Sequence, residues 1–161
     1  LNAQPGIDSK KIVLWGWSHG GSTVLSTVTH KPIFGDFSED VKFAEAIAFY
    51  PGCSAFANSN SPQKSSSPLT ILMGEADDWT PAAQCQDLAR AAAGFVPLVE
   101  SYSGAHHGFD SHAPVRLRKD VPNGVNPGQG VHVGGNPAAR EASRQRLLAF
   151  LVQHLGRDTL R

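Results

Sequence analysis

The sequence has few cysteines, no long apolar run and no excess of charge of either sign. Lys plus Arg and Asp plus Glu each number 14, so the formal net charge is zero. No basic cluster interleaved with aromatic residues is present, and neither nucleic acid nor a membrane is expected as a partner. No apolar stretch approaches the roughly 18–20 residues that a membrane-spanning helix needs. The two cysteines, Cys53 and Cys85, are compatible with one disulfide or with two free thiols.

The beginning of the chain also lacks familiar signals. Its first residue is Leu1 rather than Met, and no charged segment followed by an apolar one indicates a signal peptide. An apolar segment typical of a buried strand follows already at Lys11–Trp15. The 161 residues suit one domain. The early strand predicts that this domain begins in the middle of a fold.

Short apolar runs alternate with helical or irregular stretches along the chain. The runs that we interpret as strands are Lys11–Trp15, Glu45–Tyr50, Leu69–Met73 and Leu98–Tyr102. The stretches that we interpret as helices are Gly20–Thr29, Pro81–Ala93 and a last helix from Pro137 to the stop at Gly156. This alternation predicts an α/β fold with a mostly parallel sheet of about four strands and covering helices.

The helix boundaries follow from capping residues. Thr80 is expected to cap the helix that begins at Pro81, and Asn136 to cap the last helix. Two segments fit neither strand nor helix. Positions 58–67 are rich in Ser and Asn and are expected to form a surface loop, and Ser111–Gly135 is expected to be a long irregular excursion.

The phrase Gly16-Trp17-Ser18-His19-Gly20 fits the pattern G-x-S-x-G and lies between a strand and a helix candidate. In this context the motif forms a sharp turn that exposes the serine at the end of a sheet, and glycines on both sides avoid clashes. The helix that follows directs its N-terminus at the reacting centre. We therefore predict that Ser18 is a nucleophile and that the backbone N–H of His19 is one oxyanion-hole donor; the alternative is an ordinary tight turn.

A nucleophilic serine needs a base, and the base needs an orienting acid, in the chain order Ser, Asp or Glu, His. Asp77 and Asp78 follow the third predicted strand, and His106 and His107 follow the fourth. Carboxyl ends of strands are where open α/β sheets place their sites. The spacing alone leaves the choice within each pair open.

Four phrases together resemble the dienelactone hydrolase family of α/β-hydrolases: GWSHGG, FYPGC, GEADDWTPAAQC and YSGAHHGFD. The acid of that family stands four residues before the Pro, which implies Asp77, and its base stands two residues before a Phe, which implies His107. The namesake enzymes use a cysteine where this chain has Ser18, which implies an esterase-like relative. The resemblance covers nearly the whole chain.

Other side chains near this site have competing interpretations. Asp78 is the alternative acid or a cap of the loop or helix, and His106 is the alternative base or a surface residue. The adjacent imidazoles of His106 and His107 could form half of a metal site, but no third ligand is evident, so neither a metal nor another cofactor is expected. Trp17 and Trp79 flank the site and either line a substrate pocket or pack beneath loops. The remaining histidines, which are expected to be solvated or satisfied in the core, include His30, His112, His132 and His154.

The resemblance also gives the cysteines a context. Cys53 follows the second strand and Cys85 follows the loop with Asp77, and these strand ends are neighbours if the strands lie in sequential order. A disulfide between them is expected and favours a periplasmic or secreted protein. Two free thiols would favour the cytoplasm.

In the family the nucleophile elbow follows the fifth of about eight strands, so residues 1–161 are expected to be a partial catalytic domain, from the fifth strand to the eighth, without the N-terminal strands. The Lys11–Trp15 strand would then be an uncovered apolar edge. A missing N-terminal half or a homodimer is expected to cover it. The second oxyanion donor normally comes from the loop after the third strand, which this chain lacks.

The leading prediction is a serine hydrolase that cleaves a carboxylic ester or lactone, a small molecule, through an acyl-enzyme on Ser18. One alternative is a serine peptidase of the prolyl oligopeptidase type, since GWSHGG resembles that elbow too. The DDWTP phrase and the cysteine pair weigh against it. Another alternative is a noncatalytic fragment or binding module without a complete oxyanion hole.

Overall fold

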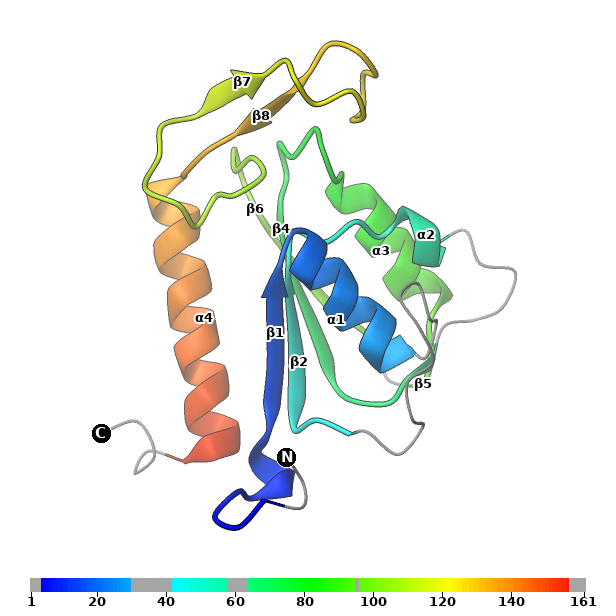
Figure 1. Ribbon diagram of the computed structural model, residues 1–161, viewed down its shortest axis with the longest axis vertical. Helices are drawn as coiled ribbons and strands as arrows, with labels where there is room; N and C mark the ends of the chain where they lie inside the picture. The colour runs from blue at the N-terminus through cyan, green and yellow to red at the C-terminus, as the bar shows by residue number, and fades with distance from the viewer. Residues whose placement is uncertain (1–3, 30–41, 58–63, 95, 157–161) are drawn as a thin grey trace.

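The computed structural model describes residues 4–29, 42–57, 64–94 and 96–156. A sheet of four parallel strands in the order β1-β2-β4-β6 lies at the centre of the molecule (Figure 1). Its strands are β1 (Val13–Trp17), β2 (Glu45–Phe49), β4 (Leu69–Gly74) and β6 (Leu98–Tyr102). The predicted α/β architecture with a mostly parallel sheet is confirmed.

The burial of the strands follows their position in the sheet. Every residue of β2 and β4 is buried, as is typical of central parallel strands that are covered on both faces. β1 and β6 form the two edges of the sheet and are only partly buried. β1 begins later than the predicted run because a short 3₁₀ helix, η1 (Ser9–Lys11), precedes it, with Asp8 as its cap.

Helices cover both faces of the sheet (Figure 1). α1 (His19–Thr29) and α3 (Ala82–Ala91) lie on one face, and α4 (Pro137–Leu155) lies on the other. α4 begins and ends as predicted, since the Asn136 side chain accepts a hydrogen bond from the Ala139 N–H and Gly156 follows its last turn. α1 has a weak helix composition and forms because Val24, Leu25 and Val28 are buried.

The predicted start of α3 is wrong in one respect. Pro81, and not Thr80, occupies the N-cap position, and no side chain caps the helix. The Thr80 hydroxyl points instead toward the backbone oxygen of Tyr50, at 3.2 Å, and toward the Asp77 carboxylate, at 3.0 Å. A tertiary interaction has therefore replaced the local cap.

The predicted surface loop at positions 58–67 is corrected in its second part; positions 58–63 lie outside the described residues. β3 (Lys64–Ser65) pairs in parallel with β5 (Ala93–Gly94). Ser67 is 1% exposed, and its hydroxyl accepts a hydrogen bond from the Phe43 N–H at 2.9 Å. The β3–β5 pairing and the Ser67 hydrogen bond join this part of the segment to the body of the domain. A short helix, α2 (Ser54–Ala57), precedes the segment.

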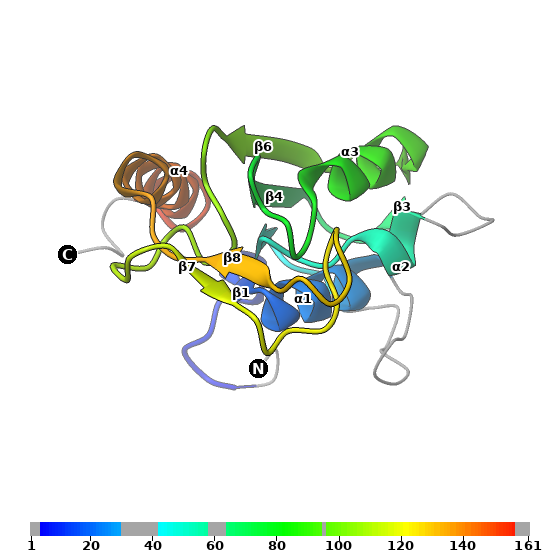
Figure 2. The same cartoon turned by 90° about the horizontal axis from the view of Figure 1, so that it is seen from above.

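The expected irregular excursion between Ser111 and Gly135 contains an antiparallel hairpin, formed by β7 (Arg116–Arg118) and β8 (Val131–Val133). The hairpin lies above the carboxyl end of the sheet, as Figures 1 and 2 show. Gly134 allows its close approach, because a Cβ there would lie 2.5 Å from the Cα of Val115. The prediction of an irregular segment is therefore wrong at these two strands.

Cys53 and Cys85 form a disulfide, as predicted, with their Cα atoms 5.0 Å apart. Cys53 immediately precedes α2 and Cys85 lies within α3, so the bridge joins a helix, not the Asp77 loop itself, to the segment after β2. Closing a loop of this size, with a sequence separation of 32, stabilises the fold by about 3–4 kcal/mol.

Among the described residues, no helix combines the length and the apolar composition that crossing a bilayer requires.

Candidate active site

Ser18 lies in the tight turn between β1 and α1. Its φ is 52°, in the left-handed region that a non-glycine residue adopts only under constraint. Gly16 is required there, because a Cβ on it would lie 2.5 Å from backbone atoms of Gly20. Gly21 is required too, because its Cβ would lie 2.9 Å from the Phe49 backbone oxygen. Gly20 itself faces open space, so the expectation that steric crowding demands glycine at both flanks holds for Gly16 only.

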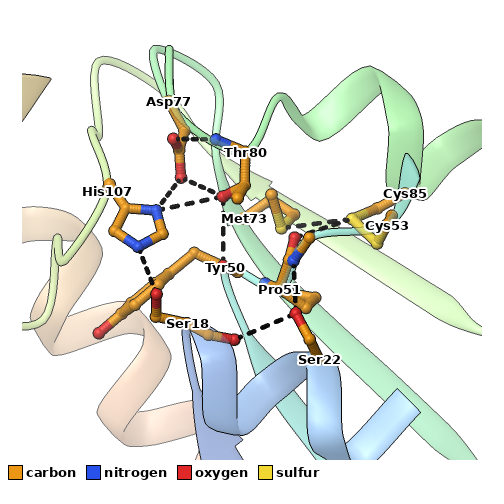
Figure 3. Close-up of a disulfide and its surroundings, with 11 residues drawn as sticks. Ser18, Ser22, Tyr50, Pro51, Cys53, Met73, Asp77, Thr80, Cys85 and His107 are labelled. Carbon is orange, nitrogen blue, oxygen red and sulfur yellow. Dashed lines mark hydrogen bonds and ion pairs between the residues drawn. A yellow bond between two sulfur atoms is a disulfide. The ribbon is translucent and has the colours of Figure 1, made fainter. Parts of the chain in front are cut away.

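A continuous series of hydrogen bonds joins Ser18, His107 and Asp77 (Figure 3). The Oγ of Ser18 lies 2.8 Å from Nε2 of His107. The Nδ1 of His107 lies 2.9 Å from Oδ2 of Asp77. These residues come from three separate strand ends, and the structure brings them together in the geometry that a nucleophile, a base and an orienting acid require.

The Asp77 carboxylate is fully enclosed and well supplied with donors. Its Oδ1 accepts hydrogen bonds from the backbone N–H groups of Trp79, at 2.9 Å, and Thr80, at 2.8 Å. Its Oδ2 faces the Thr80 hydroxyl and His107. Because burial of an unpaired carboxylate is costly, these contacts are what allow a charged Asp77 to remain inside.

Two aromatic rings flank the imidazole of His107. The Tyr50 ring lies 4.6 Å from it, between ring centroids, and the Trp79 ring lies 4.7 Å from it. Tyr50 has a φ of 37° and donates its hydroxyl hydrogen to Asp110 at 2.7 Å. Burial raises the pKa of the Tyr50 hydroxyl, and the Asp110 carboxylate raises it further, so the hydroxyl stays neutral. The contacts of the Tyr50 and Trp79 rings limit rotation of the His107 imidazole.

Trp17 and Trp79 line different hollows. Trp79 and His107 line a hollow of about 270 Å³ beneath the β7–β8 hairpin. Trp17 stacks on Phe49, with ring centroids 5.4 Å apart, and lines a separate, mostly apolar groove of about 260 Å³ beside α4. Of the two tryptophans, Trp79 is thus the one that shares a hollow with His107.

Asp78 and His106 point away from this series. Asp78 binds β8, since its Oδ1 accepts the backbone N–H of His132 at 2.8 Å and its Oδ2 lies 2.7 Å from Nδ1 of the same residue. Burial raises the pKa of the Asp78 carboxyl, but the hydrogen bonds from His132 outweigh it and hold the pKa below the ordinary value. The expectation that Asp78 caps the loop or α3 is wrong.

His106 and His107 do not form a metal half-site together, contrary to that interpretation of the sequence. His106 instead lies beside Asp78 and His132, and one potential ligand atom of each falls within 4.8 Å of the others. This cluster could not be predicted, because His132 lies in a hairpin whose position no local sequence pattern indicates.

The remaining predicted site residues are placed as follows. His19 is the first residue of α1, directly after Ser18. His112 is exposed. His154 of α4 lies 3.4 Å from the carboxylate of Glu45 of β2, so it has a protein partner and not only solvent around it. His30 lies outside the described residues.

Thr80, Tyr50 and Asp110 support the site but were not predicted to do so. Each is adjacent to a residue or phrase that had been singled out: Thr80 within DDWTP, Tyr50 within FYPGC and Asp110 at the end of HHGFD. Only their position just beyond strand ends could have indicated a role. Tyr50 and Asp110 meet across 60 residues, and Thr80 contacts the Tyr50 oxygen 30 residues away as well as Asp77 three residues before it. No local pattern identifies the long-range contacts.

The comparisons with known proteins agree on a family and a fold. The model of the dienelactone hydrolase family matches residues 1–155. A putative dienelactone hydrolase from Klebsiella pneumoniae has a TM-score of 0.60 to this chain at 16% identity, over 94% of this chain and 55% of that one. Among curated proteins, none matches this chain.

Structures of a thermophilic esterase from Thermogutta terrifontis are similar as well. With propionate bound, that esterase gives a TM-score of 0.62 at 19% identity, over 96% of this chain and 60% of that one. The same esterase phosphorylated by paraoxon gives a TM-score of 0.59 at 21% identity, over 92% of this chain and 55% of that one. These identities show a common fold, and the chain spans only 55% to 60% of the length of the structures it matches.

Proposed function

We propose that this chain, which belongs to the dienelactone hydrolase family, carries the catalytic residues of a serine hydrolase that cleaves carboxylic esters or lactones. The observation that carries the proposal is the hydrogen-bonded series from the Ser18 Oγ through His107 to the enclosed Asp77 carboxylate. The left-handed backbone of Ser18 adds to it, because strain of this kind is retained where function needs it.

The proposed reaction follows from the atoms in contact. The Oγ of Ser18 attacks the acyl carbon while Nε2 of His107 accepts its proton. His107 then gives this proton to the leaving alkoxide, and an acyl-enzyme on Ser18 remains. Water attacks the acyl group with His107 again as base, and the proton returns to Ser18. Asp77 stays ionised and holds the imidazole in the tautomer with hydrogen on Nδ1.

The oxyanion that forms during attack needs donors on the other side of the acyl carbon. We assign one to the backbone N–H of His19, because it begins α1 and the helix N-terminus favours negative charge there. In α/β-hydrolases a second donor comes from the loop after the third strand. We propose that a longer polypeptide or a partner chain supplies that loop, in keeping with the greater length of the similar structures.

The substrate is proposed to be small and to lie between Ser18 and the hollow lined by Trp79 and His107, whose volume is about 270 Å³. This volume is near the lower end of ligand pockets in general. The esterase with bound propionate is consistent with a short acyl group. The disulfide is typical of oxidising compartments, so we propose that the protein acts in the periplasm or outside the cell.

A fluorophosphonate probe tests the proposal, since it reacts only with an activated serine. We expect stoichiometric labelling of Ser18 in the protein as it occurs in its source, located by peptide mass spectrometry, and no labelling of the Ser18→Ala variant. The Ser103→Ala variant is a matched control, because Ser103 is an exposed serine outside the hydrogen-bonded series and its replacement should leave labelling intact. A folded protein that does not react would favour a noncatalytic binding module instead.

A further inference from the structure

Asp78, His106 and His132 meet beside the proposed triad but take no part in it. Asp78 and His106 are the sequence neighbours of Asp77 and His107, on the loops that follow β4 and β6, and His132 lies in β8. One ligand atom from each side chain falls within 4.8 Å of the other two. The cluster therefore joins three segments at the carboxyl end of the sheet.

The imidazole of His106 is already oriented for coordination. Its Nδ1 lies 2.8 Å from the backbone oxygen of Ala76. A carbonyl oxygen can only accept a hydrogen bond, so Nδ1 carries the hydrogen, and Nε2 of the neutral ring keeps a lone pair. Metal-bound histidines have this pattern, in which the second ring nitrogen donates to a backbone carbonyl or a carboxylate.

The Asp78 carboxylate is fixed in a similar way. Its Oδ1 accepts the backbone N–H of His132 at 2.8 Å, which leaves Oδ2 directed at the His132 imidazole, 2.7 Å from Nδ1. The side chains are accessible to ions from solution, since those of His132 and Asp78 are 47% and 29% exposed. The rings of His106 and His132 lie 5.3 Å apart between centroids.

We propose that Asp78, His106 and His132 bind one divalent transition-metal ion, with Zn²⁺ as the best fit. Two imidazoles and one carboxylate form a mixed ligand set that suits zinc, whereas Mg²⁺ and Ca²⁺ select oxygen ligands. Zinc ligands lie about 2.0–2.2 Å from the metal in a tetrahedron, and therefore about 3.4 Å from one another. The ligand atoms here lie within 4.8 Å of one another, so the more distant ones have to approach, while Oδ2 of Asp78 and Nδ1 of His132, now 2.7 Å apart, have to separate slightly. The ion takes the place of the hydrogen between Nδ1 of His132 and Oδ2 of Asp78. A neutral His132 then carries its hydrogen on Nε2, a charged one releases the extra proton to solvent, and water completes the coordination.

Binding would fasten the β7–β8 hairpin to the two loops that carry Asp77 and His107. The hairpin already contacts the second of these loops, through a bridge between Val133 and His107 and a hydrogen bond from the Gly134 N–H to the His107 oxygen, at 3.0 Å. A metal ion would add a link to both loops at once. The binding itself does not depend on the proposed hydrolase activity.

Isothermal titration of the chelator-treated protein with zinc chloride tests the proposal. We expect one equivalent to bind, the melting temperature to rise with zinc, and Co²⁺ to give visible d–d absorption typical of histidine coordination. The variants His106→Ala and Asp78→Asn should each lose at least about 100-fold in zinc affinity, which is the upper end of the effect of removing an outer-shell partner. Asp78→Asn keeps the size of the side chain and one oxygen to accept the His132 backbone N–H, so the fold should be retained.

His112→Ala is the matched control, because His112 is an exposed histidine of the same excursion and lies outside the cluster. It should bind zinc as the unaltered protein does. Failure of the unaltered protein to bind zinc would overturn the proposal. The proposal would also be overturned if the Asp78→Asn and His106→Ala variants bound zinc as tightly as the unaltered protein does. A loss of binding that occurs only in His107→Ala would overturn it too, because it would place the ion on the proposed triad.

Discussion

At the scale of single residues, Asp77 and Asp78 show how two adjacent carboxylates acquire different roles. Asp77 points inward to His107 and is enclosed by the N–H groups of Trp79 and Thr80. Asp78 points outward to His132. Successive side chains after a strand leave in different directions, so one residue of the pair meets His107 and the other meets the hairpin.

This difference predicts unequal effects of the same substitution. Asp77→Asn should lower kcat for a small ester by about 10⁴-fold, because the amide leaves the imidazole in the wrong tautomer. Asp78→Asn should lower it far less, since Asp78 does not contact His107. Steady-state hydrolysis of p-nitrophenyl acetate compares the two variants.

Circular dichroism of both variants serves as the control for folding. If Asp78→Asn were the more damaging change in a folded protein, Asp78 would be the acid and the proposed series of hydrogen bonds would not be the catalytic one. Equal, small effects would show that neither carboxylate orients a catalytic base.

Residue roles could be predicted from the sequence where the signal is local. Ser18 lies in a five-residue motif, and Asn136 caps the helix that starts beside it. The choice between Asp77 and Asp78 came only from a family resemblance, because their partners lie 30 and 54 residues away. Thr80 was misassigned as a cap for the same reason, since its tertiary partners compete with the helix end.

At the scale of elements, the strands and the helix with long, clearly patterned runs were predicted well, whereas the strands of two or three residues were not. The strands β2, β4 and β6 and the helix α4 lie within a residue or so of the predicted ranges. β3, β5, β7 and β8 have only two or three residues each. So few residues show no period, and these strands exist because backbone groups from distant segments happen to meet.

Glu45 at the start of β2 links that strand to α4, and it makes the stability of the fold depend on pH. Burial raises the pKa of Glu45 from 4.5 to about 7, although Arg146 and a hydrogen bond with Thr70 lower it. The folded state therefore holds the proton more firmly than the unfolded chain does. The contribution of Glu45 to stability falls as pH rises from about 4.5 to about 7, by about 3 kcal/mol.

We expect Glu45→Gln to remove this dependence. The free energy of unfolding of the variant minus that of the unaltered protein should be larger at pH 8 than at pH 5, by up to about 3 kcal/mol. Urea denaturation at the two pH values measures the change. His154 lies 3.4 Å from Glu45, so the comparison uses the difference between variant and unaltered protein.

Glu75→Gln provides the matched control, because it makes the same substitution at an exposed glutamate outside β2. A Glu45→Gln variant whose stability relative to the unaltered protein is the same at pH 5 and pH 8 would show that Glu45 titrates in the folded state as it does in the unfolded chain.

At the scale of the whole molecule, the sheet formed by the described residues has one edge that is both apolar and open. β1 is the terminal strand of the sheet, and its Trp15 and Trp17 are 43% and 42% exposed. The groove beside it, lined by Trp17, Phe49 and Leu147, is largely apolar. Figures 1 and 2 show β1 with β2 on only one side. An apolar edge with unpaired backbone groups pairs readily with further strands.

The edge predicts that residues 1–161, expressed alone, associate with one another through β1. Trp15→Lys should raise the monomer fraction in analytical ultracentrifugation, because a charged side chain on an edge strand opposes pairing. Val125→Lys is the control: it adds the same charge at a side chain that is 54% exposed, but in the loop between β7 and β8. A chain that is already monomeric and stable would mean that β1 needs no covering strand, and equal effects of both variants would mean that net charge, not the edge, governs association.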